Sequence, residues 1–305
     1  MDATEAQHFD AQGMVICDRA CRRCGYNLRG LHREGRCPEC GRPVGLSFEG
    51  DLLRFADPDW VETLARGSRL VIIGLGINIV SGLVTLVVTV SVNALAPMRT
   101  PPLLELLTGL CLLAGLVGTA VLYIGVWLAT RPDPTRIGED IYARSRKLVR
   151  VMLLAGIVST ALSLVLDTLP TTMPVVELVV LPLIALGELG ALIGAVTYVW
   201  YLGRLALRIP DDQLAKRARI AFWGLIITAA TAAGLALING VLAAIAGSGA
   251  LLAPLGCLLP LGALVAFGFV LLALRVQYRI RDACREQAAL ARQTWAAAEP
   301  AKTAQ

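Results

Sequence analysis

Residues 70–90 read LVIIGLGINIVSGLVTLVVTV, an uncharged apolar run that is long enough to cross a lipid bilayer as a helix. Lipid offers no hydrogen-bond partner to the backbone, so a spanning segment of this kind must be helical. Six predominantly apolar stretches of sufficient length occur in the chain, at about residues 70–94, 103–129, 148–169, 175–203, 220–246 and 251–274. The sequence therefore predicts an all-α polytopic membrane protein with about six transmembrane helices in three hairpins.

The overall composition favours the same class. Apolar residues make up 56% of the 305 positions and charged residues only 17%, whereas about a quarter of the residues in a soluble domain are charged. The alternative, buried core helices of a large soluble protein, requires a polar outer face that these apolar stretches lack.

The distribution of basic residues predicts the orientation in the membrane. Of the 28 Lys and Arg residues, all but Arg99 lie in segments expected on one side. By the positive-inside rule we expect a multi-pass protein of the inner (cytoplasmic) membrane with both termini in the cytoplasm. No apolar core segment precedes the first span, so we expect that span to direct insertion.

Asp57-Pro58-Asp59 has the residues of a helix start, with Trp60 as an expected interfacial anchor.

Composition divides the chain into five segments. The expected segments are a flexible N-terminus (1–16), a zinc ribbon (17–45), a linker with an interfacial helix (46–68), a six-helix transmembrane domain (69–275) and a cytoplasmic helical tail (276–305).

Two Cys-x-x-Cys pairs lie close together in the polar N-terminal part of the chain. Twelve residues separate Cys21 and Cys24 from Cys37 and Cys40, and a glycine follows each pair. Each pair can offer two thiolates from one tight turn, and two such turns complete a tetrahedral sulfur site. Zn²⁺ is the usual occupant, and it would stabilise a ribbon too small to fold on its own core.

Iron is the minor alternative to zinc, because each Cys-x-x-Cys-Gly sequence is also typical of a rubredoxin turn. The twelve-residue connection is short for a rubredoxin, and the sequence shows no evident aromatic shell. Cys17 and His32 are candidate substitute ligands, and we expect a spare thiol and a surface histidine at these positions. Disulfides are disfavoured in a reducing cytoplasm.

The sequence CRRCGYNLRGLHREGRCPECGRPV, followed by FADPDWVETLARG and several apolar spans, resembles the uncharacterised zinc-ribbon multispan membrane proteins common in planctomycete-type bacteria. The specific resemblance covers about residues 17–67. It implies this architecture and a metal at the four cysteines of the ribbon, and it implies no activity.

The leading functional hypothesis is a non-enzymatic interaction or regulatory protein whose ribbon is a cytoplasmic docking surface. Four cysteine ligands close a zinc site to substrate water. Seven Arg against three acidic residues between Cys17 and Val44 make the ribbon basic, which suits a protein partner or the anionic leaflet of the bilayer. Nucleic acid is disfavoured because Tyr26 is the sole stacking ring near the cluster. The sequence does not specify an oligomeric state.

The alternative hypothesis is a transporter or channel for a small solute or ion. It rests on intramembrane polar residues, chiefly Glu188, with Asn78 and Asn239 as lesser candidates. Asn in a span usually makes an interhelical hydrogen bond, and the same interpretation applies to Glu188. Enzyme activity is the least supported hypothesis and is disfavoured, since no known catalytic motif occurs and both histidines, His8 and His32, lie outside the spans.

The predicted topology can be tested with reporter fusions. Fusions at residues 100, 172 and 248 should report export, since each point follows a span that leads out of the cytoplasm. A cytoplasmic signal at two of the three points would contradict the six-span arrangement.

Overall fold

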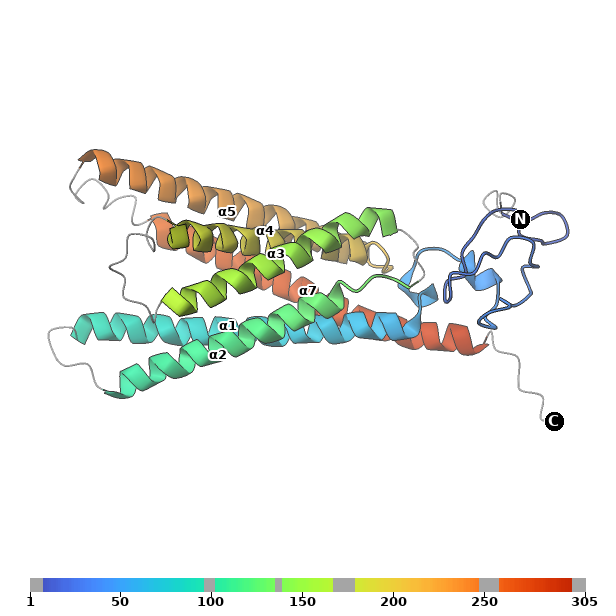
Figure 1. Cartoon of the computed structure of the whole chain (residues 1–305), viewed down its shortest axis with the longest axis horizontal. Coiled ribbons are helices and arrows are strands. Elements are labelled where there is room, and N and C mark those ends of the chain that lie inside the picture. The colour runs from blue at the N-terminus through green and yellow to red at the C-terminus, as the bar shows by residue number, and fades with distance from the viewer. Residues whose placement is uncertain (1–7, 96–101, 135–138, 167–178, 247–257, 298–305) are drawn as a thin grey trace. The chain divides into compact units, whose positions relative to one another are not determined.

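The computed structural model describes residues 8–95, 102–134, 139–166, 179–246 and 258–297. It divides into two compact units, Met1–Ile141 with Ile280–Gln305, and Tyr142–Arg279. Helices dominate both units (Figure 1). Within the described residues the only extended pairing is a set of isolated β-bridges in the N-terminal part.

Six long helices account for most of the described chain. The first unit contains α1 (Pro58–Leu95) and α2 (Pro102–Ala129), and the second contains α4 (Leu181–Ala206) and α5 (Asp212–Ala246). The helix α3 (Glu139–Leu166) lies almost wholly in the second unit, and α7 (Leu258–Ala297) contributes to both. Two short 3₁₀ helices, η1 (Gly45–Ser47) and η2 (Leu53–Phe55), precede α1.

Four of the helices are long and apolar enough to cross a membrane, which suggests a membrane protein. They are Pro58–Ser91, Pro102–Ala129, Tyr142–Leu164 and Leu181–Ala206, and they correspond to the first four predicted spans. The helices α5 and α7 run through the last two predicted spans. Many side chains there, with residues 247–257, lie outside the described part, so the count of six stays a prediction.

The outer faces of these helices are apolar. Exposed large side chains on α1 to α4 include Val80, Leu86, Leu106, Leu112, Val158 and Leu186. Several hydroxyl groups on the same helices donate to carbonyls of their own helix, as Thr85 does to Ser81 and Thr160 to Gly156. A helix whose polar groups are satisfied internally and whose surface is apolar fits a lipid environment.

The start of α1 has the predicted capping residues. The Asp57 carboxylate accepts hydrogen bonds from the backbone N–H groups of Asp59 (2.9 Å) and Trp60 (3.2 Å), and Pro58 is the first helical residue. The expected interfacial helix is therefore the beginning of α1 itself. Trp60 is buried, unlike an interfacial anchor, and its Nε1 donates to the carbonyl of Arg131 after α2.

Glycines bring α1 and α2 into backbone contact. A Cβ added at Gly67 would lie 2.5 Å from the Ala129 nitrogen, and one at Gly74 would lie 2.5 Å from the Leu122 nitrogen. Gly118 and Gly125 occupy matching positions on α2, where a Cβ would be 2.9 and 2.6 Å from α1 atoms. Each pair is seven residues apart, so two helical turns repeat the contact along one face.

In the second unit, α3 and α4 pack through three further glycines. A Cβ at Gly187 would lie 2.4 Å from Cβ of Ser159, and one at Gly194 would lie 2.9 Å from Cβ of Met152. Gly190 packs against Ala155 between them. The close helix approach predicted for Gly190-x3-Gly194 is thus present, and its partner is α3.

Substitution of the contact glycines tests the α1–α2 packing. Gly74→Ala should destabilise the protein by about 1–3 kcal/mol, because the added methyl group meets backbone rather than a movable side chain. Gly76→Ala is the matched control, since nothing lies within 4 Å of its Cβ position. Thermal unfolding of the detergent-solubilised protein measures both. Equal midpoints for the two variants would contradict the packing.

Candidate metal centre

The two Cys-x-x-Cys turns, which we call knuckle 1 (Cys21–Asn27) and knuckle 2 (Cys37–Pro43), repeat one hydrogen-bond pattern sixteen residues apart. In each, the first cysteine N–H donates to the carbonyl five residues on, at 2.7 Å to Tyr26 and 2.8 Å to Arg42. In each, the glycine N–H donates to the first cysteine carbonyl at 2.9 Å. The two turns are therefore copies of one local structure.

The glycine after each cysteine pair has the backbone conformation that this turn requires. Gly25 has φ of 80° and Gly41 has φ of 68°, in the left-handed region, which costs a non-glycine residue about 1–2 kcal/mol. The sequence prediction of tight knuckles is confirmed here. Leu28 and Val44 leave the two knuckles at matching positions, and both are fully buried.

The knuckles bring the four predicted sulfur atoms together. The sulfurs of Cys21, Cys24, Cys37 and Cys40 all lie within 4.8 Å of one another. The closest distances join the knuckles, at 3.6 Å from Cys21 to Cys40 and 3.5 Å from Cys24 to Cys37. A tetrahedral site with Zn–S bonds of about 2.3 Å has S···S edges of about 3.8 Å. The four atoms could hold a metal ion with little adjustment.

Burial and backbone N–H groups have opposing effects on the pKa values of these thiols. Burial by itself would raise the pKa of the Cys37 thiol, but N–H groups of Cys40 and Glu39 leave it below its ordinary value. Burial raises the pKa of Cys24 to about 12, against an opposing hydrogen bond from the Tyr26 N–H. Neighbouring thiols thus cannot all ionise without a cation, which is the situation that a metal ion relieves.

A small apolar core holds the knuckles, and it includes residues expected to be flexible. Phe9 and Val15 are buried together with Cys21 and Cys37. Residues 8–16 also form bridges, Phe9 with Val15 and Met14 with His32. The described part of the expected flexible N-terminus therefore belongs to the same folded module, because two knuckles alone have too few apolar side chains to cover the sulfurs. We call residues 8–50 the four-cysteine module.

Aromatic residues also line this core. The rings of Phe9 and Phe48 lie 4.6 Å apart, and both residues pack in the cluster that contains the buried cysteines. They supply an apolar aromatic cover, whereas the sequence shows no evident aromatic shell and disfavours iron partly for that reason. The composition of the shell therefore does not disfavour iron.

The other candidate ligands lie apart from the four sulfurs. The Cys17 sulfur is 3.5 Å from Nδ1 of His8, and it is half-buried and free of a disulfide. Nδ1 of His32 accepts a hydrogen bond from the Glu34 N–H, and the residue is exposed. Neither belongs to the four-residue group that could hold a metal. On α7, burial raises the pKa of Cys284 to about 12, and Cys257 lies outside the described residues.

Several arginines that looked like a basic surface hold the module together instead. Arg22 is buried, and its guanidinium donates to the carbonyls of Glu49 and Gly50. The guanidinium of Arg19 donates to the Ser47 carbonyl. Arg33 lies over the Phe9 ring. Composition could not reveal these roles, because the partner atoms are mostly backbone carbonyls.

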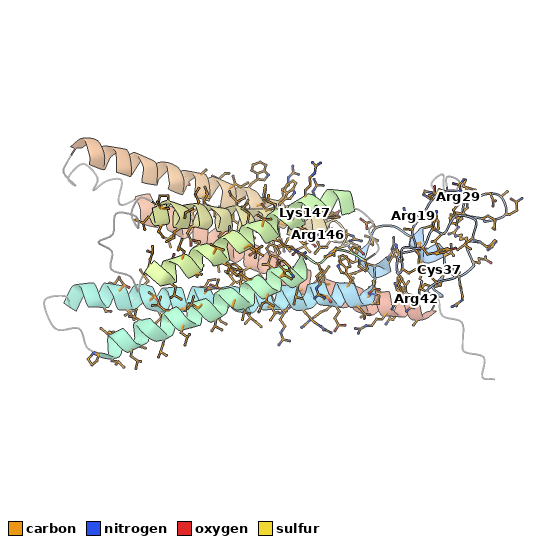
Figure 2. The ribbon with its side chains drawn as sticks, in the orientation of Figure 1. Arg19, Arg29, Cys37, Arg42, Arg146 and Lys147 are labelled. Atoms are coloured by element: carbon orange, nitrogen blue, oxygen red, sulfur yellow. The ribbon has the colours of Figure 1, made fainter. Side chains whose placement is uncertain are left out.

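Knuckle 2 contacts the C-terminal end of α7. The Arg42 guanidinium lies 4.9 Å from the ring centroid of Trp295, which is buried. In Figure 2, Arg42 lies beside the faint red end of α7, and Arg29 lies at the outer edge of the four-cysteine module. Knuckle 1 carries Tyr26 at the position equivalent to Arg42, and Tyr26 is exposed. The two copies are thus alike in backbone and different in their contacts.

The intramembrane candidates have local partners. The Asn78 amide donates to the Gly74 carbonyl at 3.1 Å and accepts from the Thr119 hydroxyl on α2 at 3.3 Å. The Glu188 carboxylate accepts from the Ser159 hydroxyl on α3 at 3.0 Å. The bonds of Asn78 with Thr119 and of Glu188 with Ser159 are interhelical, each within one unit. The side chain of Asn239 lies outside the described residues.

The strained knuckle glycines give a test of the site. Gly41→Ala should weaken metal binding about 5- to 30-fold, because the left-handed backbone costs alanine about 1–2 kcal/mol. Its Cβ would meet no atom within 4 Å, so the effect is one of backbone conformation alone. Gly50→Ala, outside the left-handed region and equally open, is the control. Competition with a chromophoric chelator measures both, and equal affinities would rule out the strain argument.

No protein-family model, curated protein or solved structure matches this chain.

Proposed function

We propose that this chain is a membrane-anchored zinc protein whose four-cysteine module is a non-enzymatic docking or regulatory element on the cytoplasmic side. The convergence of Cys21, Cys24, Cys37 and Cys40 within 4.8 Å carries this proposal. Protein sulfur would take all four coordination positions of a tetrahedral ion here, so none would be left for substrate water. A closed site of this kind is structural.

The charge and borderline softness of Zn²⁺ match four thiolates, and metal binding would supply folding free energy to the module. Structural zinc contributes roughly 10–16 kcal/mol of apparent folding free energy in small zinc domains. The four-cysteine module has a core of only a few apolar side chains and isolated bridges in place of a sheet. We therefore expect that the folded module, and any surface it presents, depends on the metal.

The difference between the knuckles supports knuckle 1 as the docking surface. Arg42 of knuckle 2 packs on Trp295 of the same chain, so this position of knuckle 2 is already occupied by an intramolecular contact. The equivalent Tyr26 of knuckle 1 is exposed, as are Arg23 and Asn27 beside it. An exposed tyrosine on a rigid turn offers a large contact area at low entropic cost, as binding hot spots do.

A transporter that uses Glu188 is the weaker candidate. Its hydrogen bond with Ser159 and the close glycine contacts beside it suit a residue that joins α3 to α4. No contact of Glu188 within the described residues favours a transport role over this one.

The proposed function is tested by metal content and partner capture on the full-length protein. The wild type should carry one Zn²⁺ per chain, Cys37→Ser should lose it, and Cys17→Ser should keep it, because Cys17 is not in the sulfur cluster. Tyr26→Ala should keep the metal and lose a partner that the wild type captures from membranes. Visible absorption by an iron centre would contradict the zinc assignment.

The variants separate the two parts of the proposal. Loss of capture in Cys37→Ser but not in Tyr26→Ala would show that a metal-dependent surface other than knuckle 1 binds the partner. Equal capture by all variants would contradict the docking role and leave the metal site standing.

A further inference from the structure

A cavity of about 660 Å³ lies within the first unit, beside the first turns of α1. The end of α2 and the C-terminal part of α7 close its other sides. Its lining residues are Glu62, Ala65, Arg66, Arg69, Leu70, Ile73, Leu128, Arg285, Ala288, Ala289 and Arg292. Four arginines and one carboxylate thus share one cavity with a set of apolar side chains.

The arginines of the cavity fall into two pairs. The first pair, Arg66 and Arg292, forms ion pairs with Glu62. The Glu62 carboxylate accepts a hydrogen bond from Arg66 at 2.8 Å and also contacts Arg292 on α7. Among the described residues, no carboxylate lies within ion-pair distance of Arg69 or Arg285. Hydrogen bonding by Arg66 holds the pKa of Glu62 below its ordinary value, so this carboxylate is charged at neutral pH. The cavity therefore has a formal excess of three positive charges.

The apolar part of the cavity lies where the membrane-like segments begin and end. Leu70 and Ile73 open the uncharged run of α1, and Leu128 is near the end of α2. Ile73 is exposed. The cavity thus has guanidinium groups beside an apolar surface that continues along α1.

We propose that this cavity binds the phosphate headgroup of an anionic phospholipid, with an acyl chain along Leu70 and Ile73. Guanidinium groups bind phosphate oxygens through paired N–H donors. A free inorganic anion would make no favourable contact with the apolar side chains of the lining, whereas an acyl chain would. Basic residues at the inner surface of a membrane attract anionic lipid. The proposal rests on α1 and α2 lying in a bilayer, which is part of the proposed function.

The site joins two distant parts of the chain. Arg66 and Arg69 come from α1, and Arg285 and Arg292 come from the C-terminal part of α7. A bound phosphate would screen the repulsion between these like charges. The lipid would thus stabilise the docking of α7 on α1, in addition to the contact of Arg292 with Glu62.

Native mass spectrometry of the full-length, detergent-purified protein tests the proposal. The protein is incubated with equimolar phosphatidylglycerol and phosphatidylcholine, and separately with phosphatidylglycerol plus inorganic phosphate. The wild type should retain phosphatidylglycerol in preference to phosphatidylcholine. The double variant R69Q/R285Q should weaken that binding by about 30-fold, given the usual effect of two basic residues at a membrane surface.

Two further variants separate the effect of net charge from the effect of the cavity itself. R144Q/R279Q removes the same charge from exposed positions outside the cavity and should bind phosphatidylglycerol as the wild type does. Ala289→Leu fills the cavity without changing its charge and should also weaken lipid binding. A thermal unfolding midpoint equal to that of the wild type shows that each variant is folded.

Three outcomes would overturn the proposal. They are equal retention of the two lipids by the wild type, equal binding by R69Q/R285Q and R144Q/R279Q, and displacement of the lipid by inorganic phosphate at the same concentration. The last would assign the cavity to a free anion. Release of the wild type from membranes by alkaline carbonate would instead contradict the membrane anchor. Failure of the lipid site can therefore be distinguished from failure of the proposed function.

Discussion

The convergence of four cysteine sulfurs is the constraint on which the N-terminal part of the molecule depends. Two knuckles with the same backbone pattern point their thiols at one place, with sulfurs as close as 3.5 Å. Of the four cysteines, Cys21 and Cys37 are buried, and four thiolates at these distances would repel one another. A bound cation would relieve this repulsion, so the proposed metal would also stabilise the fold of the module. Phe9 and Val15 pack in one apolar cluster with the two buried cysteines, Cys21 and Cys37.

The helical part depends on a different contact, the approach of backbone to backbone. Inside a bilayer, apolar side chains gain nothing by moving from lipid to protein, so helices associate where small residues allow close packing. Gly67 and Gly74 do this between α1 and α2, and Gly187 and Gly194 do it between α4 and α3. Hydrogen bonds such as that between Asn78 and Thr119 then align the packed faces.

Within the first unit, the C-terminal part of α7 connects the four-cysteine module with α1. Trp295 packs under Arg42 of knuckle 2, and Arg292 contacts Glu62 at the start of α1. Loss of metal at the knuckles would therefore remove one of the contacts that hold the C-terminal part of α7.

The sequence by itself determined the helical class, the cap at Asp57, the two knuckles and the identity of the four clustered cysteines. These features follow from periodicity and from short spacings, where the interacting atoms are a few residues apart. It did not reveal that Phe9 belongs to the module core. It also did not show that arginines of the ribbon bind backbone carbonyls inside the module. Only the tertiary structure paired Glu62 with Arg292, 230 residues away. Such a contact depends on how separate helices pack, and no local pattern in the chain encodes it.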